Sequence, residues 1–473
     1  MRTIDTDICV IGAGSGGLSV AAGAVQLGAR VVLVEAHRMG GDCLNTGCVP
    51  SKALLAAAHR AAAMRSAGRF GIDAVEPVVR FDAVNDHVGG VIAAIAPHDS
   101  VERFTRLGCT VIEARARFVG PQEVEAGDAR VHARRFVLAT GSRAAVPPIP
   151  GLADTPFFTN ETIFANRVRP AHLIVIGAGP IGCEMAQAHR RLGAAVTVLD
   201  QAGLLPKDDP ELVAVVRASL EADGVAFRLG VKVARVEREG DGIAVTIEEN
   251  GVAQRIAGSH LLVAAGRRPN VEDIGLEAAG IATSKAGVVV DARLRTTNRK
   301  VYAIGDVAGS YQFTHLANHH AGIVIRNALF RLPAKVETAA LPWVTFTDPE
   351  LAQVGLSEAA ARAQDPSVVV SRFTFAENDR AQAERATAGF IKVMSTRRGK
   401  VLGASIVGVH AGELIQPWVL AIKAGIKLNA MASMIAPYPT LAEVNKRAAG
   451  AFFAPKLFSE RTRRLIRFLL KFG

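Results

Sequence analysis

The sequence predicts an α/β fold in about three domains. Its 473 residues are more than a single hydrophobic core usually covers. Two segments, which begin near Asp7 and Leu173, each read as an apolar strand, a glycine-rich turn, a helix and a second apolar strand. From about Leu341 strands and helices alternate without such a turn. We therefore expect two Rossmann-like units followed by an α+β C-terminal domain.

The first unit combines a glycine fingerprint with an acidic residue at the end of its second strand. The fingerprint glycines are Gly12, Gly14 and Gly17. The first makes the turn, the second admits a pyrophosphate, and the third lets helix and strand pack closely. Glu35 follows the unbroken apolar strand Val31–Val34, where a carboxylate can bind a ribose diol. Together these features predict a dinucleotide site.

The second unit repeats this layout. Its fingerprint glycines are Gly177, Gly179 and Gly182. Asp200 stands at the matching strand end, and an acid there favours the free 2′-hydroxyl of NAD over the 2′-phosphate of NADP. The nearest following cation is Lys207, and no arginine follows before Arg217. We predict NADH as the preferred nucleotide, with NADP as the alternative.

Composition and charge limit which partners the protein can bind and indicate the cellular compartment in which it works. The chain carries a net charge of +11 with a pI near 9.7, but its basic residues are scattered and lie in no nucleic-acid motif, so we expect no nucleic-acid partner. No secretory signal precedes the strand Ile8–Ile11, and no apolar run is long enough to span a membrane. These observations predict a cytoplasmic protein, and there a close cysteine pair is catalytic or metal-binding more often than structural.

The segment Gly40–Lys52 carries two of the five cysteines in the chain, Cys43 and Cys48. They bracket the start of a predicted alanine-rich helix, and a helix N-terminus or a nearby cation lowers the pKa of a thiol. The alternative is part of a metal site, but no second cysteine pair or histidine cluster completes one, so we expect no metal. Cys9, Cys109 and Cys183 are expected to be inert core residues, and the adjacent His319 and His320 to have surface or packing roles.

The cysteine segment resembles the redox-active disulfide motif of the class I pyridine nucleotide-disulfide oxidoreductases. That family includes dihydrolipoamide dehydrogenase, glutathione reductase and mercuric reductase. The segment Thr140-Gly141-Ser142 is similar to a family turn between domains, and the segment from Thr297 to Gly305-Asp306 is similar to its second FAD motif. The resemblance therefore implies a glutathione reductase-like fold with FAD and a nicotinamide dinucleotide as cofactors.

The resemblance also assigns roles to single residues. Cys43 would be the interchange thiol that meets the substrate, and Cys48 the thiolate that contacts the flavin. Lys52 would lie near the flavin and pair with Glu184. Asp306 would bind the ribityl hydroxyls of FAD, and a helix starting at Thr314 would point at the flavin. The remaining residues implied to bind a cofactor are Thr140, Gly141, Ser142, Gly266 and Gly305.

By the same resemblance the chain divides into three domains and forms a homodimer. The FAD-binding domain would comprise residues 1–150 and 272–335, the NAD(P)-binding domain residues 151–271, and the dimerisation domain residues 336–473. Residues 101–150 are expected to form short strands and turns. The family's His-Pro-Thr motif, whose histidine serves as general acid and base across the dimer interface, reads Tyr438-Pro439-Thr440 here, and the family's glutamate is retained as Glu443.

The replacement of histidine by tyrosine leaves three hypotheses. A tyrosine titrates near pH 10 rather than near neutrality, so it serves poorly in dithiol exchange. The first hypothesis is a dihydrolipoamide dehydrogenase-like enzyme acting on a small disulfide or a lipoyl protein. The second is a mercuric reductase-like metal-ion reductase, and the third a redox-sensing or membrane-docked flavoprotein with little turnover.

The C-terminal tail suggests a further contact. Between Glu460 and Phe472, apolar residues recur at helical spacing while arginines and a lysine follow another face. Such a helix can lie on an anionic membrane. The alternative is that it packs on its own domain or on the dimer partner.

Overall fold

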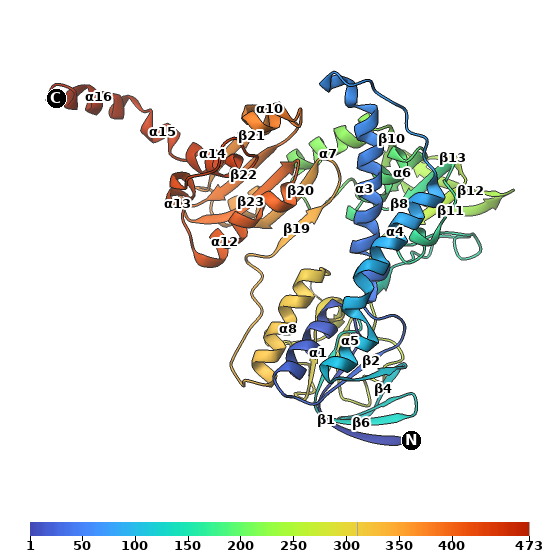
Figure 1. The fold of residues 1–473 in the computed structure, drawn as a ribbon. Coiled ribbons are helices and arrows are strands. Elements are labelled where there is room, and N and C mark those ends of the chain that lie inside the picture. Colours follow the sequence, from blue (N-terminus) through green and yellow to red (C-terminus); the bar gives the residue numbers. More distant parts are fainter. Residues whose placement is uncertain (310, 473) are drawn as a thin grey trace. The chain divides into compact units, whose positions relative to one another are not determined.

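The structure, a computed structural model, describes residues 1–309 and 311–472. The chain forms two compact units (Figure 1). Unit 1 comprises Met1–Arg65, Val75–Gln201 and Gly230–Val336, and unit 2 comprises Ser66–Ala74, Ala202–Leu229 and the chain from Glu337 onward. The domain boundaries after residues 150, 271 and 335 remain a prediction.

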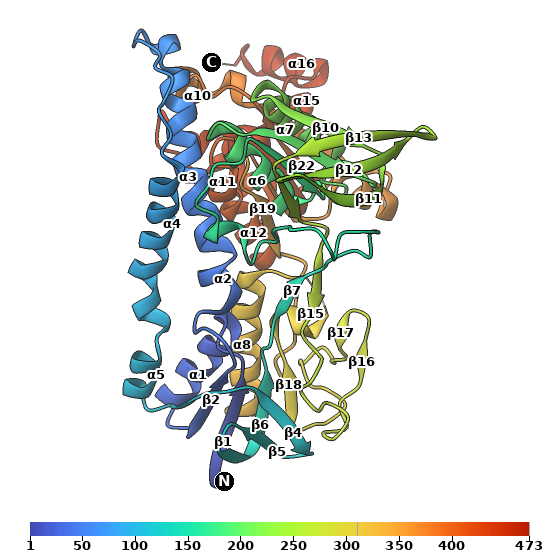
Figure 2. The ribbon, with the colours of Figure 1, turned by 90° about the vertical axis from the view of Figure 1, so that its right-hand side faces the viewer.

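The first sheet of unit 1 is built on a parallel core. Its strands lie in the order β3-β2-β1-β6-β5-β4, and β18 also pairs with β6. Residues 301–303 thus return to the sheet that the N-terminus begins, as Figure 2 shows. The strands are β1 (Arg2–Ile11), β2 (Val31–Glu35), β3 (Thr110–Glu113), β4 (Ala116–Gly120), β5 (Glu123–Ala126), β6 (Ala129–Leu138) and β18 (Val301–Ala303).

Both faces of this sheet are buried, which explains why its central strands are almost wholly apolar. Ile8 and Val10 of β1 pack with helices α1 (Ser15–Gln26) and α8 (Thr314–Ala328). Cys9 and Ile11 point into a second core on the opposite face. Alternate side chains of a strand point to opposite faces, so an apolar run is what a doubly covered strand requires.

The second parallel sheet of unit 1 carries the second fingerprint. Strand β8 (His172–Ile176) pairs in parallel with β9 (Ala195–Asp200) and β14 (His260–Val263), and α6 (Pro180–Arg191) follows the turn. An antiparallel meander of β11 (Lys232–Glu239), β12 (Gly242–Glu249) and β13 (Val252–Gly258) adds to its core. Helix α3 (Cys48–Arg65) contacts both α6 and α4 (Phe81–Ile95).

The expectation of only strands and turns in residues 101–150 is wrong at its start. Residues Val101–Leu107 form helix α5, and Ser100 caps it because its hydroxyl accepts a hydrogen bond from the backbone N–H of Arg103 at 3.2 Å. Gly108 follows in a left-handed conformation and ends the helix. The short strands β3 to β7 (Ser142–Ala144) then follow as expected.

Unit 2 is built on one antiparallel sheet in the order β19-β20-β23-β22-β21. These strands are β19 (Pro342–Thr345), β20 (Glu350–Gly355), β23 (Val401–Gly408), β22 (Phe390–Ser395) and β21 (Val369–Thr374). The core holds Trp418 of α12 (Gln416–Ala424), whose indole N–H donates to Asn445 of α14 (Glu443–Ala451) at 2.7 Å. This is the α+β arrangement that the sequence predicts.

The tight crossing of strand and helix at the first fingerprint gives a stability prediction. A Cβ on Gly17 would lie 1.8 Å from the carbonyl oxygen of Gly12. We expect Gly17→Ala to destabilise the protein by about 1–3 kcal/mol and to weaken FAD retention, because helix and strand must separate. Chemical unfolding and the flavin content after dialysis measure both effects.

Gly89 is the matched control for that substitution. It lies within α4, and a Cβ there would meet no atom within 4 Å. Gly89→Ala is expected to stabilise the helix by about 0.5–1 kcal/mol and to leave the flavin content unchanged. Equal flavin content in the two variants would contradict the role given to Gly17.

Candidate functional site

The two fingerprint turns have the same local geometry, 165 residues apart. Gly12 and Gly177 have φ of +104° and +113°, which only glycine adopts easily, and each is crossed closely by the third glycine of its motif. Both turns have the second glycine as the N-cap of the following helix, with φ of −79° at Gly14 and −75° at Gly179. One sequence pattern thus gives one backbone structure twice.

The acidic residues at the two strand ends make the same hydrogen bond to the backbone of the glycine-rich turn. Glu35 accepts a hydrogen bond from the backbone N–H of Ala13 at 2.6 Å, and Asp200 accepts one from the N–H of Ala178 at 2.7 Å. Each carboxylate therefore stands beside the turn that its glycine motif makes. A ribose hydroxyl and the adjoining phosphates could be bound side by side there.

The space around the turns fits dinucleotides. A Cβ on Gly179 would meet no atom within 4 Å, and one on Gly14 would come no closer than 3.9 Å to the backbone of Gly41. The backbone at these two helix N-termini is therefore open to a ligand. The N–H groups of a first helical turn point outward and favour a phosphate.

A cluster of side chains connects the flavin motifs to the cysteine loop. The hydroxyl of Ser142 donates to Asp306 at 2.5 Å, and the mostly buried guanidinium of Arg267 donates to Ser142 at 2.8 Å. Arg267 also forms an ion pair with Asp42 at 3.0 Å. Burial raises the pKa of Asp306, while the Ser142 hydrogen bond and the Arg267 charge oppose that rise.

The other residues assigned to flavin binding by resemblance lie in or beside this cluster. Asn270 bonds to the backbone of Thr140 and Gly141, which fixes the ATG turn. Gly141, Gly266 and Gly305 all have positive φ, as sharp turns at these points require. The Thr297 hydroxyl, by contrast, donates to the Gly280 carbonyl at 2.7 Å and accepts from the Ala282 N–H at 2.9 Å, so it is bonded to a distant segment of the chain.

The cysteine loop is held by polar contacts on its inner side. The hydroxyl of Thr46 donates to Asp42 at 2.8 Å, and the buried amide of Asn160 donates to Asp42 at 3.1 Å and to the Thr46 carbonyl at 3.3 Å. Cys43 lies in α2 (Gly41–Asn45), and Cys48 begins α3. The two thiols therefore lie on separate helices, in a loop that the Asp42 carboxylate anchors.

The two sulfurs share a hydrogen bond and differ strongly in acidity. The hydrogen bond from Cys43 lowers the pKa of Cys48 to about 6, with further lowering by Thr314 and by the charge of Lys52. The same hydrogen bond, with burial, raises the pKa of Cys43 well above its usual range. At neutral pH the pair thus holds one proton on Cys43 and a thiolate on Cys48.

Helix α8 contributes to this charge distribution. The Thr314 hydroxyl is 3.4 Å from the Cys48 sulfur, and Thr314 is the first residue of the helix. A helix N-terminus stabilises a negative charge, so α8 favours the thiolate. The predicted helix start at Thr314 is confirmed, and the ring of His320 within this helix accepts a hydrogen bond from the Gly305 N–H at 3.2 Å.

Lys52 and Glu184 lie together, as the resemblance implied. The Lys52 ammonium donates to the buried Glu184 carboxylate at 2.8 Å. Glu184 lies in the first turns of α6, directly after the second fingerprint. The ion pair therefore fixes the cation beside Cys48 against the helix of the second dinucleotide site.

Tyr438 and Glu443 lie in unit 2. The exposed Tyr438 hydroxyl donates to Asp379 at 2.8 Å, and this acceptor raises the pKa of the phenol. Glu443 is half-buried at the first position of α14. The Tyr438 hydroxyl is thus fixed as a hydrogen-bond donor to Asp379, and it keeps its proton at neutral pH.

Sequence reasoning missed Arg267 and Asn160. Arg267 directly follows Gly266, which was assigned to the cofactor site. That neighbouring position was the only signal for Arg267 in the sequence. Nothing near Asn160 in the sequence indicated a contact with a loop more than a hundred residues away. The other cysteines lie as expected in the core, where burial raises the pKa of Cys9 to about 12 and that of Cys109 to about 11. His320 is buried and His319 exposed.

Comparison with known proteins gives one consistent answer. The family model described as pyridine nucleotide-disulphide oxidoreductase matches residues 6–321, and that of its dimerisation domain matches residues 341–449. A mercuric reductase from Streptomyces lividans is 35% identical over 454 residues, covering 94% of this chain and 96% of the relative. A dihydrolipoyl dehydrogenase from Geobacillus stearothermophilus is 34% identical over 454 residues, with coverage of 94% and 96%.

A solved structure extends the likeness to three dimensions. The Cu(II) complex of the HOCl-induced flavoprotein disulfide reductase RclA from Escherichia coli has a TM-score of 0.86 and 26% identity, covering 94% of this chain and 99% of that chain.

Fold and site together define a flavoprotein oxidoreductase with two dinucleotide turns and a dithiol beside the first. The chain belongs to the pyridine nucleotide-disulphide oxidoreductase family. It is accordingly an FAD-dependent enzyme that uses a nicotinamide dinucleotide and forms a homodimer through its C-terminal domain. The predicted family and fold class are confirmed.

The contact between Thr314 and Cys48 predicts a measurable acidity. In Thr314→Val the thiolate loses a hydrogen-bond donor, and we expect the pKa of Cys48 to rise from about 6 by about one unit. The midpoint of its pH-dependent alkylation, followed on the Cys48 peptide by mass spectrometry, should rise equally. Less thiolate is then present at neutral pH.

The control for this measurement is Thr155→Val. Thr155 is buried, and its hydroxyl donates to the Gly151 carbonyl at 2.7 Å, away from the cysteines. In Thr155→Val the pH midpoint of Cys48 alkylation should match that of the unsubstituted protein. If Thr314→Val leaves the midpoint in place as well, α8 does not set the acidity of Cys48.

Proposed function

We propose that this enzyme oxidises NADH and passes two electrons through the Cys43–Cys48 pair to a small disulfide or a lipoyl group. The observation that carries the proposal is the geometry of the cysteine pair: the Cys48 sulfur lies 3.4 Å from the Thr314 hydroxyl, and the neighbouring Lys52 is held by Glu184 at 2.8 Å. This arrangement supports a dithiol that is closed to a disulfide and reopened in each turnover. The proposal extends to a dimer in which Tyr438 and Glu443 shape the partner's substrate pocket.

The electrons and atoms balance in two halves. In the first, the hydride of NADH converts the disulfide into the thiol of Cys43 and the thiolate of Cys48, and NAD⁺ is released. In the second, a substrate disulfide takes the two electrons, the proton of Cys43 and one proton from solvent; its S–S bond breaks, and the bond between Cys43 and Cys48 forms again. FAD, when bound, supplies the two-electron step between a hydride donor and a sulfur pair.

The chain's own residues bind, orient and hold charge. The turns at Gly12 and Gly177 would bind the pyrophosphates of FAD and the nicotinamide nucleotide, and Asp306 and Ser142 would bind the FAD ribityl chain. Lys52, fixed by Glu184, keeps a positive charge beside the thiolate of Cys48. Cys43 keeps its proton until a substrate disulfide is attacked.

Asp200 supports NADH as the preferred nucleotide. A carboxylate at the end of β9, already bonded to the Ala178 N–H, would repel a ribose 2′-phosphate. Cys9, Cys109 and Cys183 are buried and lie outside any disulfide, which supports a reducing compartment, and hence the cytoplasm, as the place where the enzyme works.

A second candidate function, the reduction of a soft metal ion such as Hg(II) or Cu(II), is favoured by Tyr438. Its hydroxyl is engaged with Asp379 and retains its proton, so it is not a base for Cys43. A metal ion that binds thiolates displaces the thiol proton itself and needs no such base. Mercuric reductases among the relatives, and the Cu(II) complex of RclA, agree with this alternative.

The nucleotide preference is tested by comparing NADH with NADPH. We expect kcat/KM for NADH to exceed that for NADPH by about tenfold or more, since the 2′-phosphate would meet a carboxylate. Asp200→Asn should narrow the ratio, because asparagine can still accept from Ala178 but carries no charge. Glu35→Gln, at the other turn, should leave the ratio unchanged, and equal efficiencies in the unsubstituted enzyme would refute the preference.

The substrate is tested by anaerobic NADH oxidation with lipoamide, with Cys43→Ser as the dead control. We expect Cys43-dependent turnover that accelerates as the pH rises, since the raised pKa of Cys43 leaves little thiolate at neutral pH. Tyr438→His should speed neutral turnover by about 10²-fold or more and flatten the pH profile, by supplying a base.

The substrate test has one control variant, Tyr438→Phe, and one alternative substrate, Hg(II). Phenylalanine removes the bond to Asp379 without adding a base, so it should give no acceleration. Hg(II)-dependent NADH oxidation should be indifferent to Tyr438→His. Absence of lipoamide turnover in both the unsubstituted enzyme and Tyr438→His, with Hg(II) turnover intact, would replace the disulfide by the metal ion as substrate.

A further inference from the structure

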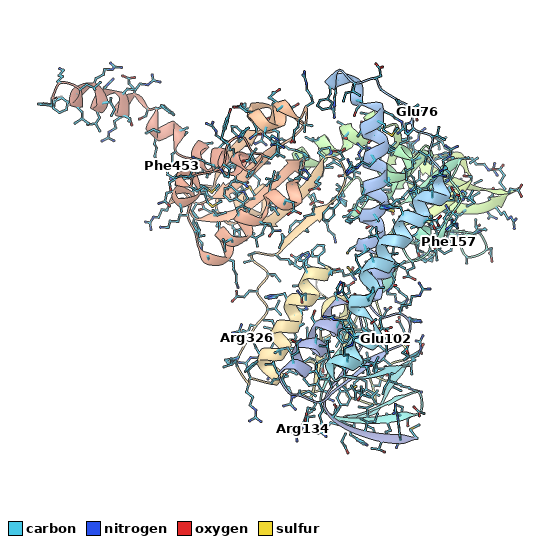
Figure 3. All side chains as sticks on the ribbon, in the orientation of Figure 1. Glu76, Glu102, Arg134, Phe157, Arg326 and Phe453 are labelled. Atoms are coloured by element: carbon cyan, nitrogen blue, oxygen red, sulfur yellow. The ribbon has the colours of Figure 1, made fainter. Side chains whose placement is uncertain are left out.

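The last helix of the chain, α16 (Glu460–Leu469), projects its side chains into solvent. Ser459 caps it, with its hydroxyl accepting from the Thr462 N–H at 3.2 Å. No residue of α16 is buried, and every residue from 463 to 472 is exposed. Figure 3 shows the side chains of this segment, beyond Phe453, projecting from a helix with no other element of unit 2 beside it.

The side chains of this segment separate into two faces. The apolar face spans more than half of the helix circumference, and its residues are Leu465, Ile466, Phe468, Leu469, Leu470 and Phe472. They are between 48% and 75% exposed, and the rings of Phe468 and Phe472 touch at 5.1 Å between centroids. The opposite face carries Glu460, Arg463, Arg464, Arg467 and Lys471, while Arg461, in the first turn, lies on the apolar side. Soluble proteins rarely leave such an apolar surface uncovered.

The charge of the tail identifies the surface that it fits. Residues 456–472 contain six basic residues and one acidic residue, Glu460, which is paired with Arg464 and Arg467. The tail thus carries +5 of the chain's +11. Basic side chains with long apolar stems keep their charges at lipid headgroups while the neighbouring apolar face enters the acyl boundary. We propose that α16, with the exposed Leu457 and Phe458 before it, docks the enzyme on an anionic membrane surface.

A second copy of this chain fits the helix less well. The family's dimerisation domain matches residues 341–449 and ends before α16. Pairing two such tails would bring two clusters of net charge +5 together, whereas an anionic lipid surface neutralises each of them. A nucleic acid would meet the basic face but leave the aromatic and aliphatic side chains in water.

The mode of attachment is peripheral. In the described part of the chain no helix is long and apolar enough to cross a membrane. A ten-residue helix is marginal by itself in water, so contact with a surface would also stabilise it. The docked enzyme would exchange electrons with acceptors held at the membrane surface as well as with dissolved ones.

Vesicle sedimentation of the FAD-loaded dimer tests this proposal. We expect binding to phosphatidylcholine vesicles that contain roughly one third phosphatidylglycerol, at least tenfold weaker binding to phosphatidylcholine alone, and loss of binding at about 1 M salt. Leu465→Glu with Leu469→Glu, and separately the change of Arg463, Arg464, Arg467 and Lys471 to glutamine, should each weaken binding at least tenfold. NADH-dependent turnover in solution should stay unchanged in both.

Each variant has a matched control away from the tail. Val168→Glu with Val252→Glu changes two apolar side chains of similar exposure, and the change of Arg2, Arg134, Arg235 and Arg362 to glutamine removes the same charge. Both controls should bind vesicles like the unsubstituted enzyme.

Three outcomes would overturn the proposal. One is equal binding by the tail variants and their controls, and another is no binding of the unsubstituted enzyme to anionic vesicles. The third is dissociation of the dimer by Leu465→Glu with Leu469→Glu in light scattering, which would make α16 part of the dimer interface. Because turnover in solution is measured on the same samples, failure of membrane docking is distinguishable from failure of the proposed activity.

Discussion

The negative charge on Cys48 is the constraint around which the site is built. A thiolate at neutral pH needs donors and positive charge from several directions, and here they come from Cys43, Thr314 and Lys52. Lys52 is in turn fixed by Glu184 on the helix of the second dinucleotide turn. The acidity of one sulfur therefore depends on three separated stretches of unit 1 folding together, which ties the chemistry to the correct packing of both dinucleotide-binding turns.

The sequence sufficed for features whose cause is local. The fingerprint glycines act on atoms a few residues away, so their spacing alone predicted turns that the structure forms twice with nearly the same dihedral angles. The helix that starts at Thr314 was predicted by family resemblance, but the contact between its hydroxyl and Cys48 is not visible in a linear pattern. Helix α5 was missed because a weak capping signal at Ser100 competed with a strand-like neighbourhood.

Long-range polar contacts were beyond sequence reasoning for the same physical reason. Asn160 and Arg267 reach Asp42 only after the chain has folded, and neither residue type is distinctive by itself. Arg267 connects the acid of the cysteine loop to Ser142, which binds the acid of the second flavin motif. A single cation thereby compensates two nearby half-buried carboxylates, whose mutual repulsion would otherwise work against the fold.

Two features bear on different aspects of this protein: Tyr438 on its proton chemistry, and α16 on the surface where it works. A phenol that donates to Asp379 retains its proton and does not act as a base, so the proton of Cys43 has to leave with the substrate, with solvent or in exchange for a metal ion. A pI near 9.7 could suggest a basic surface spread over the whole protein. Because +5 of the +11 net charge lies in residues 456–472, beside an exposed apolar face, much of the positive charge is concentrated at one place on the surface. In the proposed docking, the positive charge attracts the anionic surface from a distance, and the apolar face then holds it by direct contact.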